Sequence, residues 1–378
     1  MLLRRIFQFW AIIASFLIVP LDCFAVDIID LGASDAWCVS GNAGVVGLGR
    51  NNGQPAKIWT ASNGIQNLGT LSNITQNVGG YTSYRVSADG STVTGWYEGT
   101  DPGGNQFLWN ASNGIQNIGS ITGDYKFSAS GLSSDGKSIS GASVSGNIPV
   151  AAYWSNSNGL QYLPALDGGI RGGAFTLSTG GNFIAGYSFA SDGFNHATRW
   201  TPNGGILDIG VPTSRTASFA YGISDDGNTI VGYSSGNGSS LSFVWTPSTG
   251  IYELNPLFGE TNNALYAISP DGKVAVGGVQ GNGEWAMIWN SESNQLIDLR
   301  DLLIRNNVPG IENWTSLKLA RNVSGNATSG YNIVGWGYNK NNVVSAFLIR
   351  GLTTVPEPST WILMIFSGAI LAIKCRKY

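Results

Sequence analysis

The chain has 378 residues, of which 11% are charged and 53 are glycine. A typical soluble protein has about 25% charged residues and about 7% glycine. Few charges and many glycines favour short strands joined by tight turns, and they argue against a helical bundle and against a nucleic-acid-binding protein.

The formal net charge is −3, and the two ends of the chain are its basic parts. Residues 26–358 alone carry a net charge of −7. The charged residues outside this range are Arg4, Arg5, Asp22, Lys374, Arg376 and Lys377. Such a body would repel a phosphate backbone, so we expect no nucleic acid partner. Cys38 is its only cysteine, which excludes a disulfide framework and a cysteine zinc cluster there.

Residues 1–25 predict a secretory signal peptide. A basic start precedes an apolar run at residues 9–19, and Cys23 and Ala25 stand at positions −3 and −1 of a cleavage site. We therefore expect export by the Sec machinery and cleavage between Ala25 and Val26. An uncleaved anchor is one alternative, but the run is shorter than the roughly 20 apolar residues of a membrane span. A twin-arginine signal is the other, but the run is more hydrophobic than that export route usually carries.

The body is one unit repeated. Its tryptophans recur at intervals of 44 to 50 residues, and they are Trp59, Trp109, Trp154, Trp200, Trp245 and Trp289. Each unit has four short apolar pieces, and a turn such as "SDDGN" separates the first two. Asp-Gly between apolar runs predicts a β-hairpin, because glycine supplies the positive φ of a tight turn. Four strands in about 45 residues are typical of a β-propeller blade.

A seventh unit, at residues 321–350, has Phe347 and Leu348 at the tryptophan site and stops after three strands. The missing fourth strand is expected at residues 27–32, where it would complete the last blade without an exposed sheet edge. We therefore predict an all-β, seven-bladed β-propeller over residues 26–351. A β-solenoid is the alternative fold, and it would need two coils per unit.

The repeat resembles the extracellular HAF repeat, named for a His-Ala-Phe string before the tryptophan. His196 and Ala197 keep the first two residues of the string, and Thr198 replaces the phenylalanine. Phe243 and the pair at 346–347 keep other parts of it. The resemblance implies an extracellular repeat protein and brings no settled activity with it.

Residues 352–378 resemble the PEP-CTERM sorting signal. Pro356, Glu357 and Pro358 form the motif, and residues 360–373 follow as a predicted transmembrane helix. The basic tip after the helix consists of Lys374, Arg376 and Lys377. The resemblance implies that exosortase, a membrane enzyme of Gram-negative bacteria that make exopolysaccharide, removes this tail during delivery to the surface. A plain anchor with a cytoplasmic C-terminus is the alternative.

Residues that could carry catalysis are few. His196 is the only histidine, which excludes a histidine metal cluster, and we expect it to be structural. Four turn aspartates could be offered as glycosidase acids, namely Asp89, Asp135, Asp226 and Asp271. A glycosidase needs two acids within about 10 Å, whereas equivalent turns of different blades are spread around a ring. We therefore predict no catalytic residue, no metal site and no cofactor.

An aromatic residue follows the glycine that ends the second strand in four units, and these residues are Trp96, Tyr187, Tyr233 and Trp336. If exposed, they could stack on sugar rings; the alternative is packing between blades. Together the patterns predict an exported cell-surface or matrix protein that binds exopolysaccharide or has a structural role and is not an enzyme. A carbohydrate-active enzyme is the alternative function, and clustered acids on one rim would distinguish it.

Overall fold

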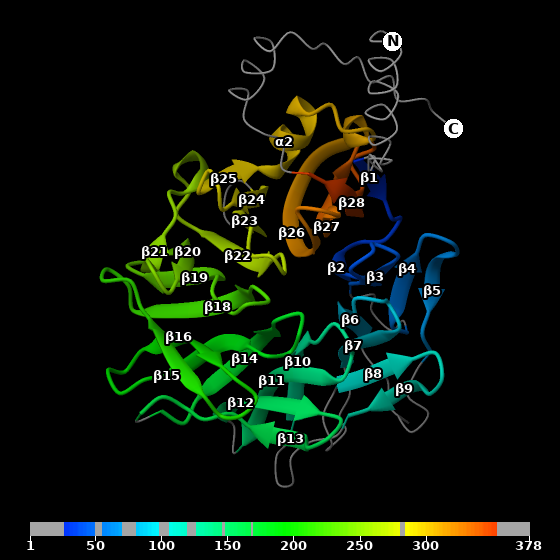
Figure 1. Ribbon diagram of the computed structural model, residues 1–378. Coiled ribbons are helices and arrows are strands. Elements are labelled where there is room, and N and C mark those ends of the chain that lie inside the picture. Colours follow the sequence, from blue (N-terminus) through cyan, green and yellow to red (C-terminus); the bar gives the residue numbers. More distant parts are fainter. Residues whose placement is uncertain are drawn as a thin grey trace, which may run out of the picture.

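The computed structural model describes residues 26–49, 55–69, 81–97, 106–118, 126–145, 148–167, 169–279 and 284–353. These residues form small antiparallel sheets arranged around a central opening (Figure 1). The expected all-β character is confirmed. The predicted signal peptide at residues 1–25 and the predicted sorting signal from residue 354 onward lie outside the described residues.

Five sheets of the described chain have four strands each. The first sheet consists of β2 (Ala36–Val39), β3 (Val45–Leu48), β4 (Lys57–Thr60) and β5 (Gly64–Asn67). The second consists of β6 (Tyr81–Val86), β7 (Thr92–Tyr97), β8 (Gln106–Asn110) and β9 (Gly114–Asn117). The third consists of β10 (Lys126–Leu132), β11 (Ser138–Ser145), β12 (Ile148–Ser155) and β13 (Gly159–Tyr162). The other two are β22 (Asn263–Ile268), β23 (Val274–Val279), β24 (Ala286–Asn290) and β25 (Gln295–Asp298), and the closing sheet of β26 (Trp314–Asn326), β27 (Gly330–Asn339), β28 (Val344–Leu352) and β1 (Asp27–Asp30).

The remaining two repeat units form one eight-stranded sheet, so the prediction of seven blades is wrong: five are separate four-stranded sheets. The eight strands are β14 (Gly172–Leu177), β15 (Ile184–Phe189), β16 (Asn195–Trp200), β17 (Ile206–Gly210), β18 (Ala217–Ile223), β19 (Ile230–Gly236), β20 (Ser239–Thr246) and β21 (Gly250–Glu253). A parallel bridge between Asn195 and Ala217 joins β16 to β18. Ser218 reinforces it, because its hydroxyl accepts from Ala197 N at 2.7 Å and donates to Gly210 O at 2.6 Å.

The N-terminal strand lies in the sheet formed by the C-terminal strands. β1 pairs antiparallel with β28, and Ile29 lies opposite Leu348. Asp27 and Arg350 form an ion pair across this ladder. Strands from the two ends of the described chain therefore share one sheet, and β28 has a hydrogen-bonded neighbour on each side.

The turns after the innermost strands hold one another around the ring. In most, a serine hydroxyl donates to the aspartate two residues later, as Ser224 does to Asp226 at 2.6 Å. Backbone N–H groups then connect successive turns: Gly41 to Ala88 O, Ala88 to Ser134 O, Ser134 to Thr179 O, Gly180 to Asp225 Oδ1, Asp225 to Pro270 O and Ala327 to Asp271 Oδ2, all at 2.6–2.9 Å. Asn332 Nδ2 donates to Gly41 O at 3.2 Å and completes the circle.

A glycine inside the second strand has a steric reason in several repeat units. A Cβ on Gly232 would lie 1.9 Å from Phe219 O, and one on Gly277 would lie 1.9 Å from Ala264 O. Gly335 has the same conflict with Leu319 O at 1.9 Å. No side chain fits this position, because the innermost strand bends toward it where its register with the second strand shifts.

Three helical segments interrupt the strands in the part of the chain that the structure describes. The helix α2 (Leu299–Arg305) begins at Asp298, whose side chain accepts from Asp301 N, and it buries Leu299 and Leu303. Two short 3-10 segments, η1 (Leu257–Gly259) and η2 (Ile311–Asn313), lie in connections to the next sheet. Within the described ranges, no helix has the length and apolar character needed to cross a membrane, and the expected helix at 360–373 falls outside them.

Candidate functional site: the mouth of the central channel

The innermost strands all contain a β-bulge at the same place, three residues before the turn serine. The register with the second strand shifts there in β2, β6, β10, β14, β18, β22 and β26. A bulge leaves one extra residue outside the ladder and redirects its side chain. The bulged residues whose side chains are described are Trp37, Ser130, Phe175, Tyr221, Tyr266 and Arg321. All six line one cavity on the axis of the ring, together with Arg85, Ser128 and Ala129. We call these nine residues the channel mouth.

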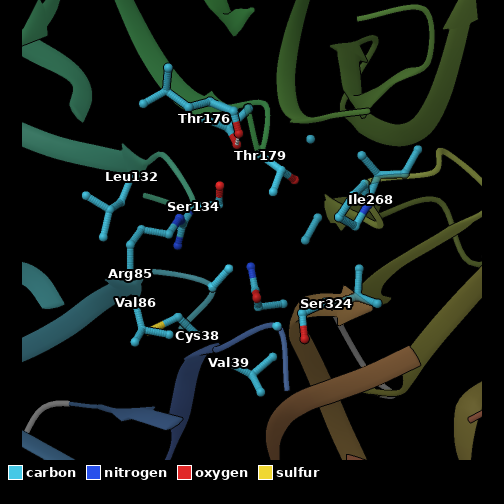
Figure 2. Close-up of a pocket in the computed structure, with 18 of the residues that line it drawn as sticks. Cys38, Val39, Arg85, Val86, Leu132, Ser134, Thr176, Thr179, Ile268 and Ser324 are labelled. Atoms are coloured by element: carbon cyan, nitrogen blue, oxygen red, sulfur yellow. Dashed lines mark hydrogen bonds between the residues drawn. The ribbon is translucent and has the colours of Figure 1, made fainter. Parts of the chain in front are cut away.

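Three adjoining cavities share residues of the channel mouth. The mouth itself has a volume of about 280 Å³. A side cavity of about 390 Å³, lined by Tyr233, Ser240 and Asn263 among others, shares Tyr221 and Tyr266 with it. A narrower cavity of about 140 Å³ continues toward the turns and is drawn in Figure 2. Concave sites of a few hundred Å³ with aromatic walls and a few polar groups are typical of small-molecule binding.

One wall of the mouth is a continuous group of half-buried aromatic rings. Phe175 stacks on Tyr221 with ring centroids 4.6 Å apart, and Tyr221 lies 5.7 Å from Tyr266. Tyr187 and Tyr233, from the second strands, flank them: Tyr187 is 5.3 Å from Phe175, and Tyr233 is 5.7 Å from Tyr221. Rings at these distances support one another and leave their outer faces or edges available to a ligand.

The opposite wall carries a fixed arginine. The Arg321 guanidinium lies 3.9 Å from the centre of the Trp37 ring and forms an ion pair with Asp35 at 2.7 Å. Burial raises the pKa of Asp35, although Arg321 lies beside it. Asp35 and Trp37 therefore hold the Arg321 side chain in one orientation.

The hydroxyls of Tyr221 in the mouth and of the adjoining Tyr233 remain protonated at physiological pH. Burial, followed by the neighbouring Tyr233 and Tyr266, raises the pKa of Tyr221, and burial also raises the pKa of Tyr233. A neutral phenol can donate as well as accept a hydrogen bond. The mouth thus combines ring faces with hydroxyl groups, which is the chemistry that recognises the faces and hydroxyls of a sugar.

Four aromatic residues were predicted from the sequence to stack on sugars, and two of them lie in this group of rings. Tyr187 and Tyr233 belong to the aromatic wall, and all four residues are half-buried. Trp336 contacts Tyr338 at 6.2 Å in the closing sheet, and Trp96 lies in β7. Of the four, only Tyr233 lines one of the three cavities, whereas Tyr187 joins the wall through its contact with Phe175.

The bulged residues of the first strands were missed by sequence analysis. Their signal was present, because Trp37, Phe175, Tyr221 and Tyr266 all stand three residues before the turn serine. Period-two alternation assigns strand residues to two faces and does not reveal a bulge. The position therefore looked like any other half-buried strand position.

The other candidate residues that the structure describes take part in contacts within the fold. His196 lies in β16, and its Nδ1 and Nε2 contact Asp208 at 2.9 Å and Asp192 at 2.8 Å. The four turn aspartates accept from their turn serines at 2.6 Å and stand in different repeat units. Within the described ranges, no group of three or more His, Cys, Asp or Glu side chains could hold a metal ion. The Pro356–Pro358 motif, the basic tip from Lys374 and Ala25 lie outside those ranges.

No protein-family model matches the sequence, and no curated protein matches it. Solved structures do match. An oligogalacturonate lyase in complex with manganese has a TM-score of 0.54 with 9% identity, over 90% of this chain and 96% of that one. An oligogalacturonate lyase from Vibrio parahaemolyticus has a TM-score of 0.52 with 9% identity, over 86% and 97%.

The chain has a β-propeller fold. At 9% identity the two lyases establish that likeness of fold and nothing further. TolB from Acinetobacter baumannii is also similar, with 15% identity and a TM-score of 0.47 over 68% of this chain, and the match spans 63% of TolB.

Proposed function

We propose that this β-propeller is an exported cell-surface protein that binds saccharide at the channel mouth. The observation that carries the proposal is the bulge in each innermost strand, which directs four aromatic residues toward one cavity of about 280 Å³. These aromatics are Trp37, Phe175, Tyr221 and Tyr266. A sheet needs no bulge for its own stability, and bulges are often found where a side chain must be redirected toward a site.

The proposed ligand class follows from the lining. Aromatic faces can stack on the C–H faces of sugar rings, and the hydroxyls of Ser128, Ser130 and the tyrosines can bond to sugar hydroxyls. An exopolysaccharide of the producing cell is the partner that agrees with the proposed PEP-CTERM signal. We also propose that the Sec machinery exports the chain and that the predicted helix holds it transiently in the inner membrane. Exosortase would then cleave the chain between the propeller and this helix.

We further propose binding without turnover. The two charged residues of the mouth are arginines, and the residues lining the three cavities include no Asp or Glu. The four turn aspartates accept hydrogen bonds in separate turns. Proton transfer to or from a glycosidic bond would need a positioned acid or base in the mouth.

Substitution of Tyr221 tests the proposal. We expect Tyr221→Ala to weaken saccharide binding up to about tenfold, since an aromatic contact is worth roughly 0.5–1.5 kcal/mol. The probe is the exopolysaccharide purified from the producing cells, with binding followed by calorimetry and the products by size-exclusion chromatography. Tyr162→Ala is the matched control, because Tyr162 is 44% exposed in β13 and does not line the cavities. Equal binding by both variants would refute the site, and shortened polysaccharide would refute binding without turnover.

A further inference from the structure

The side cavity beside the channel mouth is larger than the mouth itself. Its volume is about 390 Å³, against about 280 Å³ for the mouth. It lies where β22 packs beside β18 and β19 in the ring (Figure 1). Tyr221 and Tyr266 line both cavities, so these two side chains stand between them. A molecule bound in the mouth therefore has room to continue past the two rings.

The side cavity has its origin in one small residue of the repeat. Phe219 and Ala264 both stand two residues before the bulge of their strand. The Phe219 ring fills the space between the tyrosines of two second strands, 5.2 Å from the ring of Tyr187 and 5.2 Å from that of Tyr233. In the next unit Ala264 takes this place beside Tyr233, and it lines the cavity. A methyl group where the preceding unit has a phenyl ring leaves the space open.

The lining of the side cavity suits a sugar. Tyr221, Tyr233 and Tyr266 supply aromatic rings, and Ser240 and Asn262 supply a hydroxyl and an amide. Among the described residues, no hydrogen bond occupies the side chains of Ser240 and Asn262, and Asn262 is exposed. A hydroxyl and an amide can each donate and accept hydrogen bonds, as the hydroxyls of a sugar require.

The rim of the side cavity is held in place by Asn263. Its side-chain oxygen accepts from Ser242 N at 2.9 Å, and its Nδ2 donates to Glu260 O at 3.1 Å. These bonds tie the segment before β22 to β20. The backbone that carries the Asn262 amide is therefore fixed before a ligand arrives, which lowers the entropy lost on binding.

We propose that the side cavity is a second saccharide subsite, so that the protein binds at least two linked sugar residues, one in the mouth and one in the side cavity. This subsite rests on the proposed saccharide-binding function and extends it to a stretch of chain. Small-molecule sites usually have volumes of about 300–1,000 Å³. Each cavity alone lies near the lower limit of that range, and the two together lie well within it.

Fragments of different length test whether both cavities are used. The exopolysaccharide purified from the producing cells is partly hydrolysed by acid, and its fragments are separated by size, beginning with the monosaccharides. Each fragment is titrated by calorimetry in competition with the intact exopolysaccharide. We expect the affinity to rise about tenfold or more from the monosaccharide to the shortest fragment that reaches both cavities, because a second set of aromatic contacts is added. Longer fragments should bind no more tightly.

Two variants assign this gain to the side cavity. Ala264→Phe closes the cavity with the residue that the preceding unit uses there, so it should remove most of the gain without lowering the melting temperature. Asn262→Ala should reduce the gain by about threefold or more, because a hydrogen bond to the sugar is lost. Ala61→Phe is the control, since it adds the same ring at an exposed turn residue outside the cavities, and it should keep the full gain.

The outcomes separate the two proposals. An affinity independent of fragment length in the wild type, or an unchanged gain in Ala264→Phe, overturns the second subsite and leaves saccharide binding at the mouth in place. Failure of the wild type to bind any fragment or the exopolysaccharide overturns both. If Ala264→Phe does not fold, Asn262→Ala and Ser240→Ala decide the result, because a gain that neither of them reduces would contradict contacts in the side cavity.

Discussion

His196 shows how a single residue can make stability depend on pH. Its ring lies between Asp208 and Asp192, at 2.9 Å and 2.8 Å, and its side chain is 13% exposed. Burial disfavours the charged ring, but the hydrogen bonds to Asp208 and Asp192 outweigh burial and raise the pKa of His196 above 6.5. A raised pKa means that protonated His196 stabilises the folded state.

The sign of the pH effect follows directly. The stabilisation is complete below the unfolded-state pKa of about 6.5, and it is lost as pH rises through the higher folded-state pKa. We expect the urea midpoint of the wild type to fall between pH 6 and pH 8 by more than that of His196→Gln. Parallel pH profiles of the two proteins, measured by urea unfolding, would contradict this role for His196.

At the scale of the strand, β1 should contribute strongly to stability. Ile28 is 5% exposed and packs in a core cluster with residues of α2, β26 and β28. We expect Ile28→Ala to cost about 2–5 kcal/mol of unfolding free energy, as is usual for a truncated core side chain. Deletion of residues 26–32 should cost more and lower solubility, because β28 would become an open edge.

The ion pair of the same strand provides the control. The side chains of Asp27 and Arg350 are 29% and 40% exposed, so Asp27→Asn should cost less than about 1 kcal/mol. Denaturant unfolding of the three variants gives the comparison. A deletion no more harmful than Asp27→Asn would show that the ring does not depend on β1.

The secondary structure was largely predictable because turn and strand signals recur. Turns such as the one at Asp226 need both the serine hydroxyl and the glycine, and both are visible in the sequence. The joining of two units into one eight-stranded sheet was not predictable, because it depends on one parallel bridge at Asn195. The helix α2 was not predicted, although the N-cap Asp298 and the spacing of Leu299 and Leu303 are both visible in the sequence.

The sequence predicted that aromatic residues would form the candidate site, but it did not identify most of them. Aromatics on the second strand were noticed because they follow an obvious glycine, and two of them, Tyr187 and Tyr233, join the aromatic wall. The bulge that directs Tyr221 into the channel is a property of strand register and becomes visible only when both strands are placed. That Arg85 and Arg321 line the same cavity likewise becomes visible only when the ring is assembled.

For the whole molecule, we predict that the C-terminal tail is removed during delivery to the surface. Glu357→Gln, or deletion of residues 374–378, should trap a longer, membrane-bound form if exosortase processes the tail. Intact-mass measurement on protein from the native cell surface gives the test, and Glu260→Gln in the described part of the chain is the control. A mature wild-type species that still ends at Tyr378 would contradict processing.

The place of β28 has a mechanical consequence for a protein held through its C-terminal side. β28 pairs with β1 on one edge and with β27 on the other, so a pull on the chain after Leu352 loads two ladders of hydrogen bonds at once. Bonds loaded together along a strand break together, whereas bonds at a free edge peel apart one by one. Resistance to force depends on the unfolding rate, so the N-terminal strand would act as a clamp that protects the ring while the chain is under tension.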